Sequence, residues 1–364
     1  MAGLGETIGR LARLRLAGAA HGEAASGQAM AEVKGFGPNP GALRMFLHAP
    51  ADLPAYAPLV VTLHGCGQGA AAFAGAGGWL ALAERLGFAV LAPEQGVLNN
   101  LNRCFNWFSP RDVARGKGEA ASIAAMIGHA VRVLGLDETR IFVVGLSAGG
   151  VMAGALLAAY PELFAGGAII AGAPYAGTRG LSAGLKLMRQ GDGRGGRVLA
   201  DLVLQAAAGR ARRPLRLSIW HGAVDEVVNP VNAREITDQW ICALGLPPAP
   251  VEQVELDRRS RLLWRGPEAG LRAGPAVELN LVTDMGHGAP LSTLRAGDVG
   301  APAPFMLETG VSSTLEIADF WGLAAPAAFG ETGGGDEAKG FVARLRRSLA
   351  EVLGAIGPSR PSRR

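Results

Sequence analysis

The sequence predicts an α/β fold in which a mostly parallel central sheet carries helices on both faces. Short runs rich in β-branched residues, PLVVTLHG (58–65), FAVLAP (88–93) and IFVVG (141–145), each end at or close to Gly or Pro, as strands do. Runs with helical spacing, WLALAERLG (79–87) and EAASIAAMIGHAVRVLG (119–135), stand between them. Apolar strands that alternate with helices are typical of parallel sheets covered on both sides.

The same alternation continues further along the chain. VMAGALLAAYP (151–161) predicts a helix, while AGGAIIAG (165–172) and PLRLSIWHG (214–222) predict two more strands. Between these strands, residues 175–213 contain apolar helical stretches around a Gly-Arg-rich linker. We expect a helical insertion there, which is either a cap over a site or a plain crossover connection.

Composition shifts divide the chain into three parts. Residues 1–39 are predicted to form a helical or flexible extension, and residues 40–324 the α/β domain. Residues 325–340 have the composition of a flexible linker. The tail that completes the segment 325–364 is predicted to be an amphipathic helix, because its apolar residues fall on one helical face. These residues are Phe341, Leu345, Leu349, Val352 and Ile356.

Charge and composition exclude several classes of protein. The chain has 364 residues, of which 49% are hydrophobic and 18% charged, so most of it is expected to fold. No apolar run approaches the roughly 20 residues of a membrane span. The net charge of +4 includes no dense basic stripe, so a nucleic-acid partner is not expected. The N-terminus has no continuous apolar segment of the kind found in secretory signals.

Cysteine spacing argues against a metal or redox site. The three cysteines show no CxxC pattern and have no nearby histidine partners, and they can form at most one disulfide.

The segment Gly145-Leu146-Ser147-Ala148-Gly149 follows a predicted strand and precedes a predicted helix. Gly-x-Ser-x-Gly in this context is the nucleophile elbow, in which flanking glycines leave room for a sharp turn that exposes the serine. Ser147 is therefore a candidate nucleophile. The alternative is that Gly and Ser here form an ordinary turn that caps a helix.

A serine nucleophile needs a base to take its proton and an acid to orient that base. In this fold the order along the chain is Ser, acid, His. Asp225 follows the strand PLRLSIWHG, and His287 follows the strand-like run VELNLVTDMG, so both belong to loops at the carboxyl ends of strands. We therefore expect Asp225 to be the acid and His287 the base, with Asp284 and Glu226 as alternative acids.

The other histidines fit the role of base less well. His21 and His48 precede the core strands, and His129 lies within a predicted helix. His64 and His221 stand beside glycines at strand ends but too early in the chain, so structural roles are expected for them.

A tetrahedral intermediate also needs hydrogen-bond donors for its oxyanion. The backbone N–H of Ala148 is expected to be one donor, and the N–H of Cys66, in the loop LHGCGQG (63–69), the other. The same glycine-rich loop could be a simple turn, but it lacks the lysine and the spacing of phosphate-binding loops.

Taken together, the motifs resemble the esterase family of extracellular-type short-chain poly(3-hydroxybutyrate) depolymerases, which includes feruloyl and acetylxylan esterases. The resemblance covers about residues 40–322, in the order of the family. Its motifs are LHGCGQG, GWLALAERLGFAVLAPEQ, NRCFNWF, GEAASIAAMI, VVGLSAGGVMAGALLAAYPELFAGGAIIAGAPY, IWHGAVDEVV and GHGAPL.

The resemblance implies an α/β-hydrolase that cleaves carboxylic esters with a triad of Ser147, Asp225 and His287, and with Cys66 and Ala148 as oxyanion donors. It implies an ester or polyester substrate and no metal or organic cofactor. It also favours an extracellular or periplasmic location, with a cytoplasmic location as the alternative because no secretory signal is visible. The alternatives are a feruloyl, acetylxylan or general short-chain esterase, then a serine peptidase on the same fold, and a non-catalytic binding module.

Family position also suggests roles outside the triad. Trp107, Phe105 and His64 become candidates for substrate binding, and Cys66 and Cys104 could pair as a disulfide. The sequence departs from the family at Ala289, where members often have Trp, and at Gly177, where a Cys is common. A separate domain for binding dense polymer is not recognisable.

Overall fold

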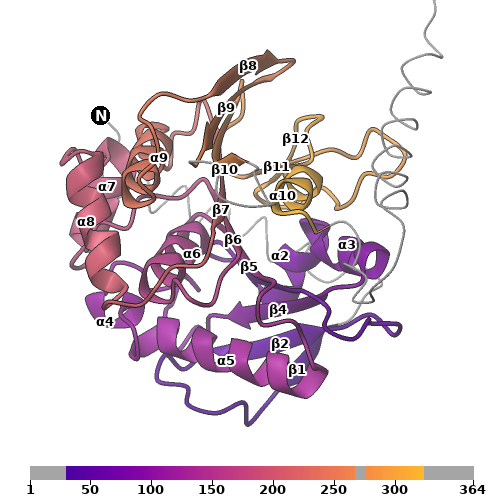
Figure 1. Cartoon of the computed structure of the whole chain (residues 1–364). Helices are drawn as coiled ribbons and strands as arrows, with labels where there is room; N and C mark the ends of the chain where they lie inside the picture. Colours follow the sequence, from indigo (N-terminus) through magenta and orange to yellow (C-terminus); the bar gives the residue numbers. More distant parts are fainter. Residues whose placement is uncertain (1–29, 267–274, 324–364) are drawn as a thin grey trace, which may run out of the picture. The chain divides into compact units, whose positions relative to one another are not determined.

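The computed structural model describes residues 30–266 and 275–323 (Figure 1). The chain divides into two compact units, Met1–Ala324 and Ala325–Arg364, and all described residues belong to the first. The predicted linker and C-terminal helix, like the first 29 residues of the predicted N-terminal extension, lie outside the described residues.

A twisted ten-stranded sheet forms the centre of this unit, and its middle is parallel as predicted. In spatial order the parallel strands are β4 (Ala89–Glu94), β3 (Leu59–Leu63), β5 (Ile141–Leu146), β6 (Gly166–Ile170), β7 (Arg216–Gly222) and β10 (Pro275–Val282). Because these strands are parallel, the loops that follow them lie at one edge of the sheet, where open α/β sheets bind ligands.

Antiparallel strands extend the sheet on both sides. β2 (Arg44–His48) and β1 (Ala31–Val33) continue it beyond β4, while β9 (Arg259–Arg265) and β8 (Glu252–Leu256) continue it beyond β10. Residues 31–33, predicted to be part of a helical or flexible extension, are instead an edge strand paired with β2. A separate parallel pair is made by β11 (Ala289–Leu291) and β12 (Met306–Glu308).

Side chains that alternate along the strands build a core on each face of the sheet. In β5, Val143 joins one core, whereas Phe142 and Val144 join the other. The first core is covered by α4 (Pro110–Val113), α5 (Gly118–Leu134), α6 (Ala148–Ala159), α7 (Leu181–Gln190), α8 (Gly196–Ala206) and α9 (Val231–Ala243). The second is covered by α2 (Ala70–Ala76), α3 (Trp79–Leu86) and α10 (Ser313–Trp321). The α/β prediction is therefore confirmed.

The segment 175–213 connects β6 to β7, which are parallel neighbours, and it contains α7 and α8 (Figure 1). It is thus a crossover connection. Its first helix also lies close to the loop before α4, because the N–H of Gly180 donates to the carbonyl of Phe108 at 2.8 Å. A Cβ added at Gly184 would lie 3.0 Å from the ring of Trp107.

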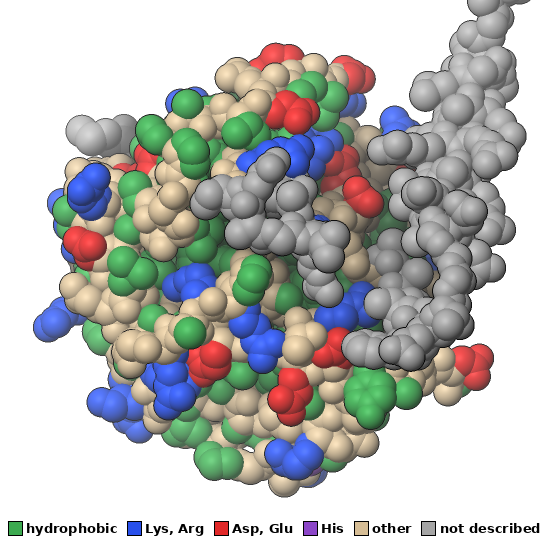
Figure 2. Space-filling model, in the orientation of Figure 1, with side chains coloured by type: hydrophobic (Ala, Val, Ile, Leu, Met, Phe, Trp, Pro, Cys, Tyr) green, Lys and Arg blue, Asp and Glu red, His purple; other side chains and the backbone are tan. Residues whose placement is uncertain are grey.

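The face of the molecule displayed in Figure 2 shows no grouping of one charge among the described residues. On the face displayed in Figure 2, acidic, basic and apolar side chains are intermixed, and the basic groups form no continuous stripe. Among the described residues, no helix combines the length and the apolar character that a membrane crossing requires.

The ring of Trp321 fixes α10 to the sheet, and removing it should destabilise the fold. Trp321 is 4% exposed and stacks on Phe142 and Trp79, with ring centroids 5.0 and 5.7 Å away. We expect Trp321→Ala to lower the free energy of unfolding by about 3–5 kcal/mol, as for other buried aromatic side chains. Urea unfolding followed by circular dichroism measures this. The control is Leu294→Ala, at a side chain that is 72% exposed; an equal loss in both variants would contradict the packing role.

Candidate active site

Ser147 lies at the junction of β5 and α6 in a strained conformation. Its φ is 55° and its ψ is −117°, a combination that costs a non-glycine residue on the order of 1–3 kcal/mol. The turn depends on its glycines, because a Cβ at Gly145 would lie 2.1 Å from the carbonyl oxygen of Gly149, and one at Gly149 would lie 2.1 Å from that of Leu63. The backbone therefore holds the serine at a sharp turn.

The three residues expected to form a triad are brought together across the sheet. The Nε2 atom of His287 lies 2.9 Å from the Oγ of Ser147, and its Nδ1 lies 2.8 Å from Oδ2 of Asp225. Ser147 follows β5, Asp225 follows β7 and His287 follows β10, so loops at the carboxyl ends of parallel strands supply all three. This geometry allows the imidazole to accept the serine proton while its other nitrogen donates to the carboxylate.

Asp225 is held by donors from several directions. Its Oδ1 accepts the backbone N–H groups of Val227 and Val228 at 2.8 and 2.9 Å. Its Oδ2 faces His287 and also lies 3.3 Å from Nε2 of His221. Burial by itself would raise the pKa of Asp225, but the hydrogen bonds and charges of His221 and His287 outweigh it and hold that pKa well below its usual range. The carboxylate therefore stays ionised at neutral pH.

His221 has the structural role that its position predicts. It is fully buried, and its Nε2 donates to the carbonyl of Val228 at 2.8 Å. The same nitrogen faces Asp225, so His221 braces the turn that carries the acid.

The alternative acids and bases lie elsewhere. Asp284 and Glu226 are both exposed, and the carboxylate on His287 is that of Asp225. His48 is paired with Glu84 at 2.9 Å, and His129 lies within α5. His21 is outside the described residues.

Gly222 allows the loops of the acid and the base to approach, and sequence reasoning missed it. A Cβ at this position would lie 2.2 Å from the carbonyl oxygen of Met285 and 2.3 Å from that of Gly286. The N–H of Val224 also donates to the carbonyl of Met285 at 3.1 Å. The signal in the sequence was the glycine that ends β7, three residues before Asp225.

The acid's loop is tied to the crossover segment as well. The carbonyl of Met188, near the end of α7, accepts the N–H of Asn229 at 2.8 Å and the side-chain amide of Asn232 at 3.0 Å.

The two expected oxyanion donors belong to adjacent loops. Leu63, at the end of β3, pairs with Gly145 of β5, so the segment with Cys66 lies beside the elbow that carries Ala148. Among the described residues, the backbone N–H groups of Cys66 and Ala148 have no hydrogen-bond acceptor. An oxyanion formed at Ser147 would require backbone donors of this kind.

A disulfide joins Cys66 to Cys104, with the two Cα atoms 4.2 Å apart. The N–H of Gly67 also donates to the carbonyl of Asn102 at 2.8 Å. The loop that bears Cys66 is therefore attached, covalently and by hydrogen bonding, to the segment 102–108. Cys242 is a free cysteine.

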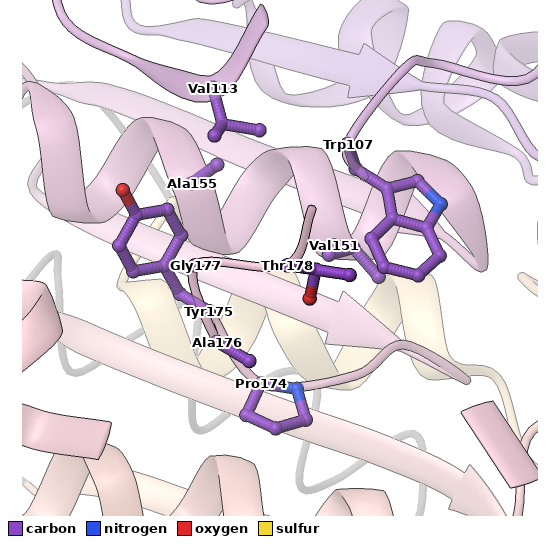
Figure 3. Close-up of a pocket in the computed structure, with 9 residues that line it drawn as sticks. All are labelled: Trp107, Val113, Val151, Ala155, Pro174, Tyr175, Ala176, Gly177 and Thr178. Atoms are coloured by element: carbon purple, nitrogen blue, oxygen red, sulfur yellow. The ribbon is translucent and has the colours of Figure 1, made fainter. Parts of the chain in front are cut away.

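Of the three candidates for substrate binding, Trp107 lines a pocket. That pocket is small, and its walls include Trp107, Val151, Tyr175 and Thr178 (Figure 3). Val151 is one helical turn from Ser147, since its N–H donates to the carbonyl of that residue at 3.0 Å.

The structure corrects the expectation for His64 and Phe105. Both are 0% exposed, and their rings pack together with centroids 4.9 Å apart. The Nδ1 atom of His64 lies 2.8 Å from the carbonyl of Gly65, and its Nε2 accepts the N–H of Gln95 at 3.1 Å. Burial lowers the pKa of His64, so this ring is neutral and supports the oxyanion loop from the interior.

Comparison with known proteins identifies the family. Residues 43–251 match the model of the esterase PHB depolymerase family. The chain belongs to this family. It is 37% identical to poly(3-hydroxyalkanoate) depolymerase C of Paucimonas lemoignei, over 81% of this chain and 70% of that one. It is 29% identical to feruloyl esterase B of Talaromyces funiculosus, over 60% of this chain and 63% of that one.

Among solved structures, the acetyl xylan esterase of Aspergillus awamori has a similar fold. The two align with a TM-score of 0.68 and 22% identity, over 81% of this chain and the whole of the esterase. Family membership and fold together make this chain a carboxylic-ester hydrolase of the α/β-hydrolase type.

Replacing the acid of the triad should leave the fold but remove most of the activity. We expect Asp225→Asn to lower kcat by about four orders of magnitude, because an amide no longer stabilises the charged imidazole or fixes its tautomer. Steady-state hydrolysis of a p-nitrophenyl ester measures this. Glu226→Gln, at the exposed neighbouring carboxylate, is the matched control. If this control variant were the inactive one, the acid would be Glu226.

The disulfide predicts the number of reactive thiols. Denatured protein kept free of reductant should show one thiol, that of Cys242, and reduced protein should show all three. Titration with a chromogenic disulfide reagent counts them. Three thiols before reduction would show that Cys66 and Cys104 are not joined.

Proposed function

We propose that the chain hydrolyses poly- or oligo-(3-hydroxybutyrate)-type polyesters through an acyl-enzyme on Ser147. The observation that carries the proposal is the continuous hydrogen-bonded series from Ser147 through His287 to Asp225. These three residues lie at the carboxyl ends of strands in a member of an esterase family, which also supports ester hydrolysis.

Acylation begins with Ser147. As the hydroxyl attacks the ester carbonyl, Nε2 of His287 takes its proton, and Asp225 stabilises the imidazolium that forms. The N–H groups of Cys66 and Ala148 hold the negative oxygen of the tetrahedral intermediate. His287 then gives its proton to the departing alcohol, which for a hydroxyacid polymer is the hydroxyl end of the shortened chain.

Deacylation repeats these steps with water. His287 takes a proton from the water as it attacks the acyl carbonyl, and the oxyanion is held by the same two donors. Collapse of the intermediate returns the proton to Ser147 and releases the acid. Every proton moves through one imidazole, so this series of steps uses residues of the chain and water alone.

Similarity to a poly(3-hydroxyalkanoate) depolymerase over 81% of this chain supports the polyester as substrate. Trp107 is the substrate-binding side chain that we propose to retain from the sequence-based candidates. It lines a small pocket whose walls include Val151, one helical turn from Ser147.

A second candidate function is the hydrolysis of feruloyl or acetyl esters. It is supported by 29% identity to feruloyl esterase B and by 26% identity to acetylxylan esterase A of Aspergillus awamori, over 71% of this chain. The same triad would serve all of these esters, so the substrate has to be distinguished by experiment.

Ser147→Ala tests the nucleophile. We expect kcat on p-nitrophenyl butyrate to fall by several orders of magnitude, because only binding and oxyanion stabilisation remain. Circular dichroism checks that the variant is folded. A folded variant with wild-type activity would contradict the proposed role of Ser147.

Substrate profiling of the wild type tests the polyester. We expect kcat/KM on 3-hydroxybutyrate oligomers to exceed that on methyl ferulate and acetylated xylan. A higher kcat/KM on methyl ferulate or acetylated xylan would support the second candidate function instead. Rapid cleavage of matched amides would indicate a peptidase.

A further inference from the structure

Glu119 is a fully buried carboxylate outside the triad, in the first turn of α5. Its Oε1 accepts side-chain amide donors from Gln95 at 2.6 Å, Asn106 at 2.7 Å and Asn99 at 3.4 Å. Its Oε2 accepts the backbone N–H of Asn106 at 2.8 Å. All four partners donate, so the arrangement needs a group that accepts on both oxygens, as an ionised carboxylate does.

The side-chain amides of Gln95 and Asn106 cannot rotate to accommodate a group other than a carboxylate at position 119. The Nε2 atom of Gln95 also donates to the carbonyl of Cys104 at 3.1 Å, and its Oε1 accepts from Asn99 at 2.7 Å. The Oδ1 atom of Asn106 accepts from Asn100 at 2.8 Å. Rotating either amide by 180° would place donor against donor or acceptor against acceptor. The orientation of each amide is therefore fixed by these other partners too, and its NH2 group stays directed at the carboxylate of Glu119.

From Glu119, two routes of contact lead to the loop that carries Cys66. Along the first, Gln95 donates its backbone N–H to His64, and His64 contacts the carbonyl of Gly65, which precedes Cys66. Along the second, Gln95 holds the carbonyl of Cys104, whose sulfur is bonded to Cys66. The carboxylate thus supports the oxyanion loop from the interior and through the disulfide.

Keeping this carboxylate ionised opposes folding. Burial raises the pKa of Glu119 to about 7, and the nearby carboxylate of Asp112 adds to the rise, while hydrogen bonds from Asn106 and Gln95 counteract it. Between the ordinary pKa of 4.5 and 7, the folded chain holds this proton more tightly than the unfolded chain does. Stability therefore falls as pH rises through that interval.

We propose that Glu119 is a positioning residue that sets the backbone of Cys66 for oxyanion binding. The proposal rests on the proposed function and extends it to a residue that touches no reacting atom. Glu119 belongs to the motif GEAASIAAMI, which contains no triad residue, and the proposal assigns this motif a function in positioning Cys66.

Glu119→Gln tests this role with the smallest change in shape. One carboxylate oxygen becomes an NH2 group, which faces donors that cannot rotate away. We expect kcat on p-nitrophenyl butyrate to fall about 10- to 100-fold with little change in KM, because a misplaced donor acts mainly in the transition state. Binding of butylboronic acid, whose tetrahedral adduct on Ser147 mimics the intermediate, should weaken by a similar factor.

Glu278→Gln is the matched control, since Glu278 is also a buried carboxylate, 1% exposed, held by Arg261 at 2.6 Å. It lies in β10, away from the oxyanion loop, and should keep the wild-type kcat and boronate affinity. If Glu119→Gln does not fold, Gln95→Met removes the amide that joins Glu119 to Cys104 and should show the same split between kcat and KM.

Failure of this proposal can be told apart from failure of the proposed function. If Ser147→Ala is inactive while Glu119→Gln matches the wild type, or if Glu278→Gln loses as much as Glu119→Gln, the positioning role is wrong and the triad stands. If the wild type cleaves no ester but binds butylboronic acid in a way that Glu119→Gln weakens, the proposed function is wrong and the positioning role stands.

Discussion

Close approach of backbone to backbone at the strand ends is the constraint on which the rest of this structure depends. The turn at Ser147 brings the start of α6 against the end of β3, where a Cβ at Gly149 would lie 2.1 Å from the carbonyl of Leu63. The same kind of contact recurs at Gly222, where the loop of the acid meets that of the base. Because no side chain separates these segments, Ser147, His287 and Asp225 lie within hydrogen-bonding reach of one another.

Two buried carboxylates then hold the loops, and their environments push their pKa values in opposite directions. Both are removed from water and both accept hydrogen bonds from loop backbone. Asp225 has two histidines beside it, which favour its charged form, so its pKa falls. At Glu119 burial raises the pKa to about 7, a nearby aspartate adds to the rise, and the hydrogen bonds from neutral amides only partly counteract it. The first carboxylate acts directly on the base, and the second acts through the backbone that it supports.

Local signals in the sequence predicted the fold and much of the site because the relevant constraints are local. A β-branched run ended by glycine is a buried strand whatever surrounds it, and Gly-x-Ser-x-Gly has its meaning within five residues. What failed depends on distant contacts. Nothing near His64 or Phe105 in the chain shows that their rings pack on one another inside the protein. The helix α9 was missed because the buried Asn232 and Gln239 interrupt its apolar face.

The edges of the sheet were missed for a related reason. Strand β8, with the sequence EQVEL, is largely exposed, and its register comes from pairing with β9. Neither periodicity nor composition marks such a strand, since its stability comes from a neighbour that the chain supplies later.

The attachment of α7 to the acid's loop bears on how a long substrate reaches the serine. Asn229 and Asn232 both bond to the carbonyl of Met188, so α7 cannot swing outward without breaking these bonds or pulling on the segment that follows Asp225. In enzymes with a hinged lid, the lid can open without moving the residues that orient the catalytic base. Here the position of α7 and the position of the loop that carries Asp225 are coupled by these hydrogen bonds. Movement of α7 would therefore shift the segment that follows Asp225, so the site stays assembled only while this crossover helix stays in place.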